Sequence, residues 1–170
     1  MTDYFALYNL PHAFQIDESL LKQRYQQLQK LTHPDRFASA SEQEKRLYMQ
    51  KNAQVNDAYY VLKTPVKRGE HLLALRQFPL PDEQATMGDT EFLMQQMELR
   101  EALADADNQQ QLEAFIKSVE SLDEDLTQQI EQALSAQDHA SNEAAASALT
   151  KLKFLNKLAA EADNKLQQVS

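Results

Sequence analysis

The tripeptide His33-Pro34-Asp35 places an imidazole, a helix-breaking ring and a carboxylate side by side in the stretch KLTHPDRFAS. By itself this pattern indicates a simple turn, in which Pro34 ends a helix and Asp35 forms a local hydrogen bond beside a solvated His33. Basic residues flank the turn on both sides: Lys22, Arg24, Lys30 and Arg36. In an otherwise acidic chain, they form a local positive surface suited to steering an acidic partner towards the turn.

The remaining residues that could support catalysis do not form a recognisable site. The chain has four histidines far apart in the sequence, two glycines and no cysteine. The histidines lack the spacing of paired metal ligands or of a nucleophile and its base. Two glycines cannot build a phosphate-binding loop, and the lack of cysteine excludes thiol nucleophiles and thiolate ligands. We therefore expect a protein that is not an enzyme and that has no catalytic residue, metal site or cofactor.

The composition favours a globular all-α fold. Of 170 residues 42% are hydrophobic, with only two glycines and five prolines. The net charge of −9 argues against nucleic acid as the main partner. No stretch approaches the roughly 20 apolar residues of a membrane span, and the N-terminus does not resemble a secretory leader. We expect a cytoplasmic protein that binds neither nucleic acid nor membranes.

Two long helices are expected on either side of the turn. Asp17 is a candidate N-cap for a helix over residues 18–31, which ends before Pro34. The sequence SEQE then forms a capping box for a second helix that reaches residue 63 and has Leu47 on its expected apolar face. Because the connection is short, the two helices should be antiparallel. The pattern therefore predicts a helical hairpin with the turn at its tip.

The chain divides into two domains with different charge. A segment without periodicity, residues 77–88, contains two prolines and a glycine and is expected to be a linker between domains over 1–76 and 89–170. Residues 1–88 carry 11 basic and 10 acidic side chains, whereas residues 89–170 carry 6 and 16. The first domain should also contain a short helix near residues 4–10 and a shorter helix that Thr64 and Pro65 begin.

Three helices are expected in the second domain. One spans about residues 90–106, and apolar residues repeat at steps of three and four over 112–133 and 145–166. This spacing predicts an antiparallel three-helix bundle, with a long coiled coil as the alternative.

The first of these three helices has two apolar faces. At about 100° per residue, Phe92, Leu99 and Leu103 form a narrow stripe that should face the core, while three other apolar residues and three carboxylates point away from it. Phe154, on the last helix, also lies off its core stripe. The expected binding surface consists of Leu93, Met94, Met97, Glu98, Glu101, Asp105 and Phe154. Packing against a neighbouring element is the alternative for the apolar members.

The turn and its helices resemble a J-domain over about residues 2–76, with His33, Pro34 and Asp35 as the signature. This resemblance implies that the turn and the four basic residues around it bind a DnaK-type chaperone and stimulate its ATPase. Most J-domains have Tyr at the position of Thr32 and Lys at that of Arg36, so the chain departs from the pattern at both. The glycine- and phenylalanine-rich linker and the zinc-binding cysteine repeats of general J-proteins are missing, which indicates a specialised client.

Two stretches of the second domain, FLMQQMELRE and KLKFLNKL, are similar to the C-terminal domain of the HscB family of co-chaperones in iron-sulfur cluster assembly. This resemblance implies that the bundle binds an IscU-type scaffold protein through the seven surface residues and that the chaperone is HscA. Met97 and Asp105 stand where the family often has Leu and Glu. A general J-domain co-chaperone with another client, or a purely structural helical scaffold, is the alternative.

Overall fold

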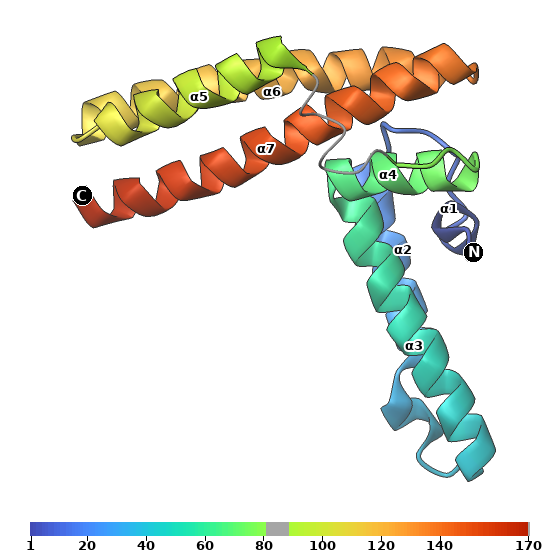
Figure 1. The fold of residues 1–170 in the computed structure, drawn as a ribbon. Coiled ribbons are helices and arrows are strands. Elements are labelled where there is room, and N and C mark those ends of the chain that lie inside the picture. Colours follow the sequence, from blue (N-terminus) through green and yellow to red (C-terminus); the bar gives the residue numbers. More distant parts are fainter. Residues whose placement is uncertain (81–88, 170) are drawn as a thin grey trace. The chain divides into compact units, whose positions relative to one another are not determined.

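The computed structural model describes residues 1–80 and 89–169, so most of the expected linker and Ser170 lie outside the described residues. The described residues form seven α-helices and one 3₁₀ helix and contain no strand, which confirms the all-α prediction. The chain divides into two compact units, Met1–Gln77 and Phe78–Ser170 (Figure 1). No helix in the described part of the chain is long and apolar enough to cross a membrane.

Unit 1 contains the expected hairpin, formed by two of its helices. Its elements are α1 (Tyr4–Leu7), α2 (Glu18–Thr32), the 3₁₀ helix η1 (Pro34–Phe37), α3 (Glu42–Lys63) and α4 (Pro65–Leu75). Two predicted caps are confirmed, because Asp17 accepts a hydrogen bond from the Leu20 N–H (3.1 Å) and Ser41 accepts one from the Glu44 N–H (3.2 Å). Thr64 is the N-cap residue of α4, but its hydroxyl donates to the Tyr60 carbonyl (3.1 Å) and caps nothing.

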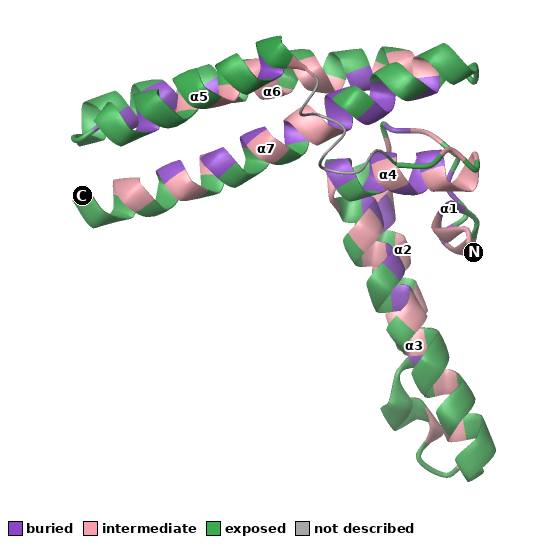
Figure 2. Ribbon diagram, viewed as in Figure 1, coloured by how far each residue is buried: buried purple, intermediate pink, exposed green. Residues whose placement is uncertain are grey.

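The apolar core of unit 1 lies at the base of the hairpin, where α1 and α4 pack against α3 and Leu21 of α2 is buried. Towards the tip, most residues are exposed (Figure 2). Leu47, expected on the apolar face of α3, is 48% exposed because this part of α3 extends beyond the core. The buried apolar residues are Phe5, Tyr8, Leu10, Phe14, Leu21, Val55, Ala58, Leu62, Val66, Leu72 and Leu73.

Polar side chains from the helices hold the N-terminal segment of unit 1 in place. Arg24 donates to the Tyr8 carbonyl (2.9 Å), buried Arg68 donates to the Phe14 carbonyl, and the Nε2 atom of His71 accepts from the Tyr4 N–H (3.1 Å). Burial lowers the pKa of Arg68, but both of its contacts to backbone carbonyls, at Phe14 and Leu62, leave the charge hydrogen-bonded. All six tyrosines of the chain lie in this unit, and the chain has no tryptophan.

Unit 2 is the expected three-helix bundle, made of α5 (Thr90–Asp105), α6 (Gln109–Ser135) and α7 (His139–Val169). Short connections reverse the chain after α5 and α6, so the three segments are separate helices and not one long coiled coil. α6 and α7 pack along each other, and α5 adds a narrower contact (Figure 1). The buried apolar cluster shared by the three helices contains Leu103, Ala106, Leu112, Phe115, Val119, Leu155, Leu158 and Ala162.

Candidate functional site

The turn at the hairpin tip presents one carboxylate to solvent. α2 ends at Thr32, and the chain enters η1 at Pro34, whose fixed φ suits the first position of a helix. The Nδ1 atom of His33 accepts a hydrogen bond from the Asp35 N–H (3.2 Å) and lies 3.6 Å from an Asp35 carboxylate oxygen. The Asp35 side chain is 94% exposed. The turn therefore fixes the backbone of Asp35 while its carboxylate stays accessible.

An aromatic contact anchors the far side of the turn to α3. The ring of Phe37 stacks on the ring of Tyr48 with centroids 3.6 Å apart. Arg36 also reaches back to the Lys30 carbonyl at 3.5 Å. Both contacts join the short 3₁₀ segment to the long helices, so the turn is not a free loop.

The basic residues around the turn do not share one face of α2. Lys22 and Lys30 are exposed and lie roughly 80° apart around the helix, whereas Arg24 lies about 200° from Lys22. The guanidinium of Arg24 donates to the Tyr8 and Asn9 carbonyls, so Arg24 has a structural role. Exposed Arg36 adds a third accessible cation beside the turn. That these four residues bind a chaperone stays a prediction.

The second face of α5 is open to solvent in unit 2. Leu93, Met94 and Met97 are 36%, 57% and 72% exposed, whereas Phe92 and Leu103 on the opposite face are buried. The three carboxylates expected beside them, Glu98, Glu101 and Asp105, are exposed as well. We call Leu93, Met94, Met97, Glu98, Glu101 and Asp105 the α5 patch.

Phe154 lies at the edge of the bundle core. Its half-buried ring meets the Phe92 ring edge-on, with centroids 5.9 Å apart, and the guanidinium of Arg100 lies 5.5 Å from its centre. These contacts correspond to the edge packing that the sequence left open as an alternative. A role for Phe154 in partner binding stays a prediction.

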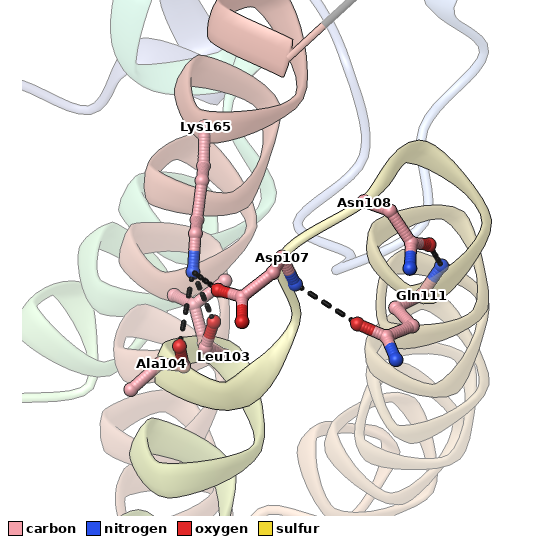
Figure 3. Close-up of polar contacts among 6 residues, drawn as sticks. All are labelled: Leu103, Ala104, Asp107, Asn108, Gln111 and Lys165. Atoms are coloured by element: carbon pink, nitrogen blue, oxygen red, sulfur yellow. Dashed lines mark hydrogen bonds and ion pairs between the residues drawn. The ribbon is translucent and has the colours of Figure 1, made fainter.

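Charged contacts with α7 hold α5 at both ends and in its middle. Lys151 pairs with Asp89, the N-cap of α5 (3.7 Å), and Arg100 pairs with Glu161 (3.1 Å). At the other end, the Nζ atom of Lys165 donates to the carbonyls of Leu103 (2.8 Å) and Ala104 (3.2 Å) and lies 4.0 Å from Asp107 (Figure 3). Because the last turn of α5 contains no basic residue, Lys165 supplies the cation that a helix C-terminus favours. These contacts fix the helix that carries the α5 patch.

The connection that follows α5 is also ordered by side chains. Asn108 caps α6 by accepting a hydrogen bond from the Gln111 N–H (2.9 Å), and the Gln111 side chain accepts one from the Asp107 N–H (2.9 Å) (Figure 3). Two backbone donors are therefore satisfied in the short link between α5 and α6.

The sequence did not identify the polar contacts that join α2 and α3 near the turn. Gln29, Asn52 and Asn56 lie between the two helices and bond to one another. The spacing of Asn52 could have indicated them, because Asn52 falls on the same helical stripe as Val55 and Tyr59 and should therefore face α2. Among the described residues, no group of three His, Asp or Glu side chains could hold a metal ion.

Comparisons with known proteins agree along nearly the whole chain. Residues 88–163 match the family model of the HSCB C-terminal oligomerisation domain. A co-chaperone protein HscB homolog from Pseudoalteromonas atlantica is 51% identical, over 99% of this chain and 98% of that protein. The chaperone HscB from Vibrio cholerae has a similar structure, with a TM-score of 0.90 and 41% identity over 99% of this chain and 100% of that one. The crystal structure of human co-chaperone protein HscB has a TM-score of 0.90 and 32% identity, over 97% of this chain and 82% of that one.

Proposed function

The chain belongs to the HscB co-chaperone family, and from this premise we propose that it is an adaptor between a DnaK-type chaperone, HscA, and an IscU-type scaffold protein. Membership of this family implies a role in iron-sulfur cluster assembly, and a co-chaperone is not an enzyme. The proposal therefore concerns which partners the chain brings together and how it changes the activity of one of them.

Unit 1 engages the chaperone. Lys22, Lys30 and Arg36 attract an acidic surface of the chaperone over a long range and raise the rate of encounter. Asp35 then offers its carboxylate to a basic group of the chaperone, preferably an arginine, in a charge-assisted hydrogen bond. If that bond is stronger in the hydrolysis-competent conformation, binding shifts the chaperone towards that conformation and accelerates ATP hydrolysis.

Unit 2 holds the scaffold protein through the α5 patch. The flexible methionines adapt to the shape of an apolar partner surface, and the carboxylates at the rim discriminate against acidic partners. The chain has no cysteine and offers no thiolate to a cluster. The cluster therefore stays on the scaffold protein while the co-chaperone presents that protein to the chaperone.

Joining the two functions in one chain raises the effective concentration of the scaffold protein at the chaperone. The observation that carries this proposal is the exposure of two chemically different surfaces on separate units. One surface is the carboxylate of Asp35, and the other is the apolar part of the α5 patch.

The test is single-turnover ATP hydrolysis by the chaperone, measured with the co-chaperone, with the scaffold protein and with both. We expect each to stimulate hydrolysis and the two together to stimulate it more than the product of their separate effects. Asp35→Asn removes the charge with almost no change in shape and should reduce stimulation at least tenfold, since a charge-assisted contact in the active complex is lost. Scaffold binding by this variant should be unchanged.

The matched control is Asp57→Asn, which removes the same charge from an exposed position of α3. It should stimulate like the original chain. Equal stimulation by the Asp35 and Asp57 variants would remove the turn from the mechanism. A lack of synergy with the scaffold protein would instead indicate a different client.

A further inference from the structure

Apart from the stack of Phe37 on Tyr48, the tip half of the hairpin is held by polar groups. The buried apolar residues of α3 begin at Val55, so the part of the helix nearer the turn has no apolar core of its own. In its place, side chains of α2 and α3 form a continuous series of hydrogen bonds towards the turn. This amide ladder consists of Tyr25, Gln29, Thr32, Asn52 and Asn56.

The ladder begins next to a stacked aromatic pair. The rings of Tyr25 and Tyr59 lie 4.0 Å apart, and the Tyr25 hydroxyl donates to the Asn56 side-chain oxygen (2.9 Å). Gln29 donates from its amide nitrogen to the Tyr25 hydroxyl (3.0 Å) and to Asn56. The bottom of the ladder is thus fixed to the edge of the core.

Asn52 is at the centre of the upper half of the ladder. Its Nδ2 atom has two hydrogens, and it donates to the Gln29 side-chain oxygen (2.9 Å) and to the Thr32 hydroxyl (3.1 Å). Its Oδ1 atom accepts from the Asn56 amide (3.3 Å). Every polar atom of the Asn52 side chain therefore has a partner, and a fully satisfied network of this kind favours one arrangement over its alternatives.

Thr32 ends the ladder at the turn. Its side chain is largely buried, and its hydroxyl donates to the Leu28 carbonyl (2.8 Å) while it accepts from Asn52. Thr32 is the last residue of α2, and His33 and η1 follow directly. The position of the Thr32 backbone therefore sets where the chain leaves α2 and where the turn begins.

We infer that Thr32 and Asn52 are positioning residues, whose hydrogen bond across the hairpin fixes the orientation in which the turn presents Asp35. The inference rests on the proposed function, because it assigns the ladder a role in stimulating the chaperone. Neither side chain needs to touch the chaperone. They act by keeping α2 and α3 in one register, so that the carboxylate of Asp35 occupies a single region of space.

The central test compares Thr32→Val, which removes the hydroxyl and keeps the shape, with Thr32→Ser, which keeps the hydroxyl. ¹⁵N relaxation of the full-length chain should show larger motion of the Asp35 amide in the valine variant alone. The valine variant loses the bond from Asn52 and the bond to the Leu28 carbonyl. Maximal stimulation of the chaperone ATPase should fall roughly fivefold in this variant and return with serine. The concentration of co-chaperone that gives half-maximal stimulation should change by less than about twofold, because Lys22 and Lys30 are unchanged.

Thr150→Val is the matched control, because the Thr150 hydroxyl makes the same kind of bond to a carbonyl one turn earlier, at Ala146 (3.1 Å), but in unit 2. It should leave the turn and the ATPase unchanged. Asn52→Ala removes the same bond to Thr32 together with those to Gln29 and Asn56, so its effect should be at least as large as that of Thr32→Val. The double variant should be little worse than Asn52→Ala alone, because the bond between the two residues is already lost.

Three results would overturn the inference: an Asp35 amide as rigid in Thr32→Val as in the original chain, a looser turn with undiminished maximal stimulation, or equal losses in the valine and serine variants. A failure of the proposed function is a separate outcome. In that case the original chain itself would not stimulate the chaperone, and the relaxation data on Asp35 would still decide whether the ladder orients the turn.

Discussion

The two exposed surfaces of this chain are held in position by different kinds of contact. At the hairpin tip, neutral hydrogen bonds between α2 and α3 support a single charged group, Asp35. On α5, charged contacts with α7 support a surface of three apolar side chains and three carboxylates. The comparison indicates that recognition through one charge depends on direction, whereas recognition through apolar area tolerates small shifts of the helix that carries it.

The largest expected effect tests the apolar surface. Replacing both Leu93 and Met97 by Ala should weaken binding of the scaffold protein about fiftyfold, because two central apolar contacts are lost. Since Met97 is 72% and Leu93 is 36% exposed, the free energy of unfolding should change by less than about 1 kcal/mol. Titration calorimetry and thermal unfolding by circular dichroism measure the two quantities.

Leu103→Ala provides the buried comparison on the same helix. This side chain is 8% exposed within the bundle core, so its loss should destabilise unit 2 by about 3 kcal/mol. If the double variant of Leu93 and Met97 were destabilised to a similar degree, those side chains would contribute to the core and the division of α5 into two faces would be wrong.

The second test separates the two surfaces by their response to salt. At subsaturating concentrations, chaperone stimulation should fall roughly tenfold between about 50 mM and 300 mM salt, whereas scaffold binding should change by less than about threefold. Stopped-flow association rates for each partner check this difference. Lys30→Gln should reduce the salt dependence of chaperone association. Lys117→Gln, which removes the same charge from an exposed position of α6, should not. Equal salt dependence for both partners would contradict the expected difference between the two surfaces.

A smaller effect is expected where α5 is held to α7. Lys165→Met removes the donor to the Leu103 and Ala104 carbonyls, so scaffold affinity should fall about threefold as the last turn of α5 loosens. Amide hydrogen exchange over residues 103–106 should increase in parallel. Lys157→Met is the control, because this side chain is exposed on the same helix. If amide hydrogen exchange were unchanged in the Lys165 variant, the remaining contacts would be sufficient to hold the last turn of α5.

The smallest effect concerns pH and unit 1 alone. Burial lowers the pKa of His71 below its ordinary value of 6.5, with Asp3 opposing the shift and His12 adding to it. Because the folded state resists protonation, the stability that neutral His71 provides is complete above pH 6.5 and is lost as the pH falls below that value. Protonation also removes the acceptor for the Tyr4 N–H.

Tyrosine fluorescence isolates this effect, because unit 2 has no tyrosine. The melting temperature of unit 1 should be lower at about pH 5.5 than at about pH 7.5. His71→Gln, which retains an acceptor but does not titrate in this range, should have a weaker pH dependence. An unaltered pH dependence in that variant would assign the effect to other groups.

The features that the sequence predicted are local. N-caps at Asp17 and Ser41, the two apolar faces of α5 and the exposed turn depend on residues within one or two helical turns of each other. The overall helical architecture followed from the same signals.

The features that it did not predict depend on distant partners. Arg24 was grouped with the other basic residues by proximity in sequence, but its acceptors lie 15 and 16 residues earlier in the chain. The bond between Asn52 and Thr32 spans 20 residues and requires a particular register of α2 and α3. Leu47 lies at the spacing expected for a core residue, but the core of unit 1 ends before this position. Helical spacing predicts which face of a helix is apolar and not how far along the helix the core extends.

The ordered N-terminal segment has a practical consequence for protein production. An affinity tag joined to Met1, which is 88% exposed, should not disturb folding. Deleting the first 14 residues would remove Phe5, Tyr8, Leu10 and Phe14 from the interior and would leave buried Arg68 without the Phe14 carbonyl. A version shortened to the predicted start of α2 would therefore be expected to misfold rather than to yield a minimal chaperone-stimulating fragment.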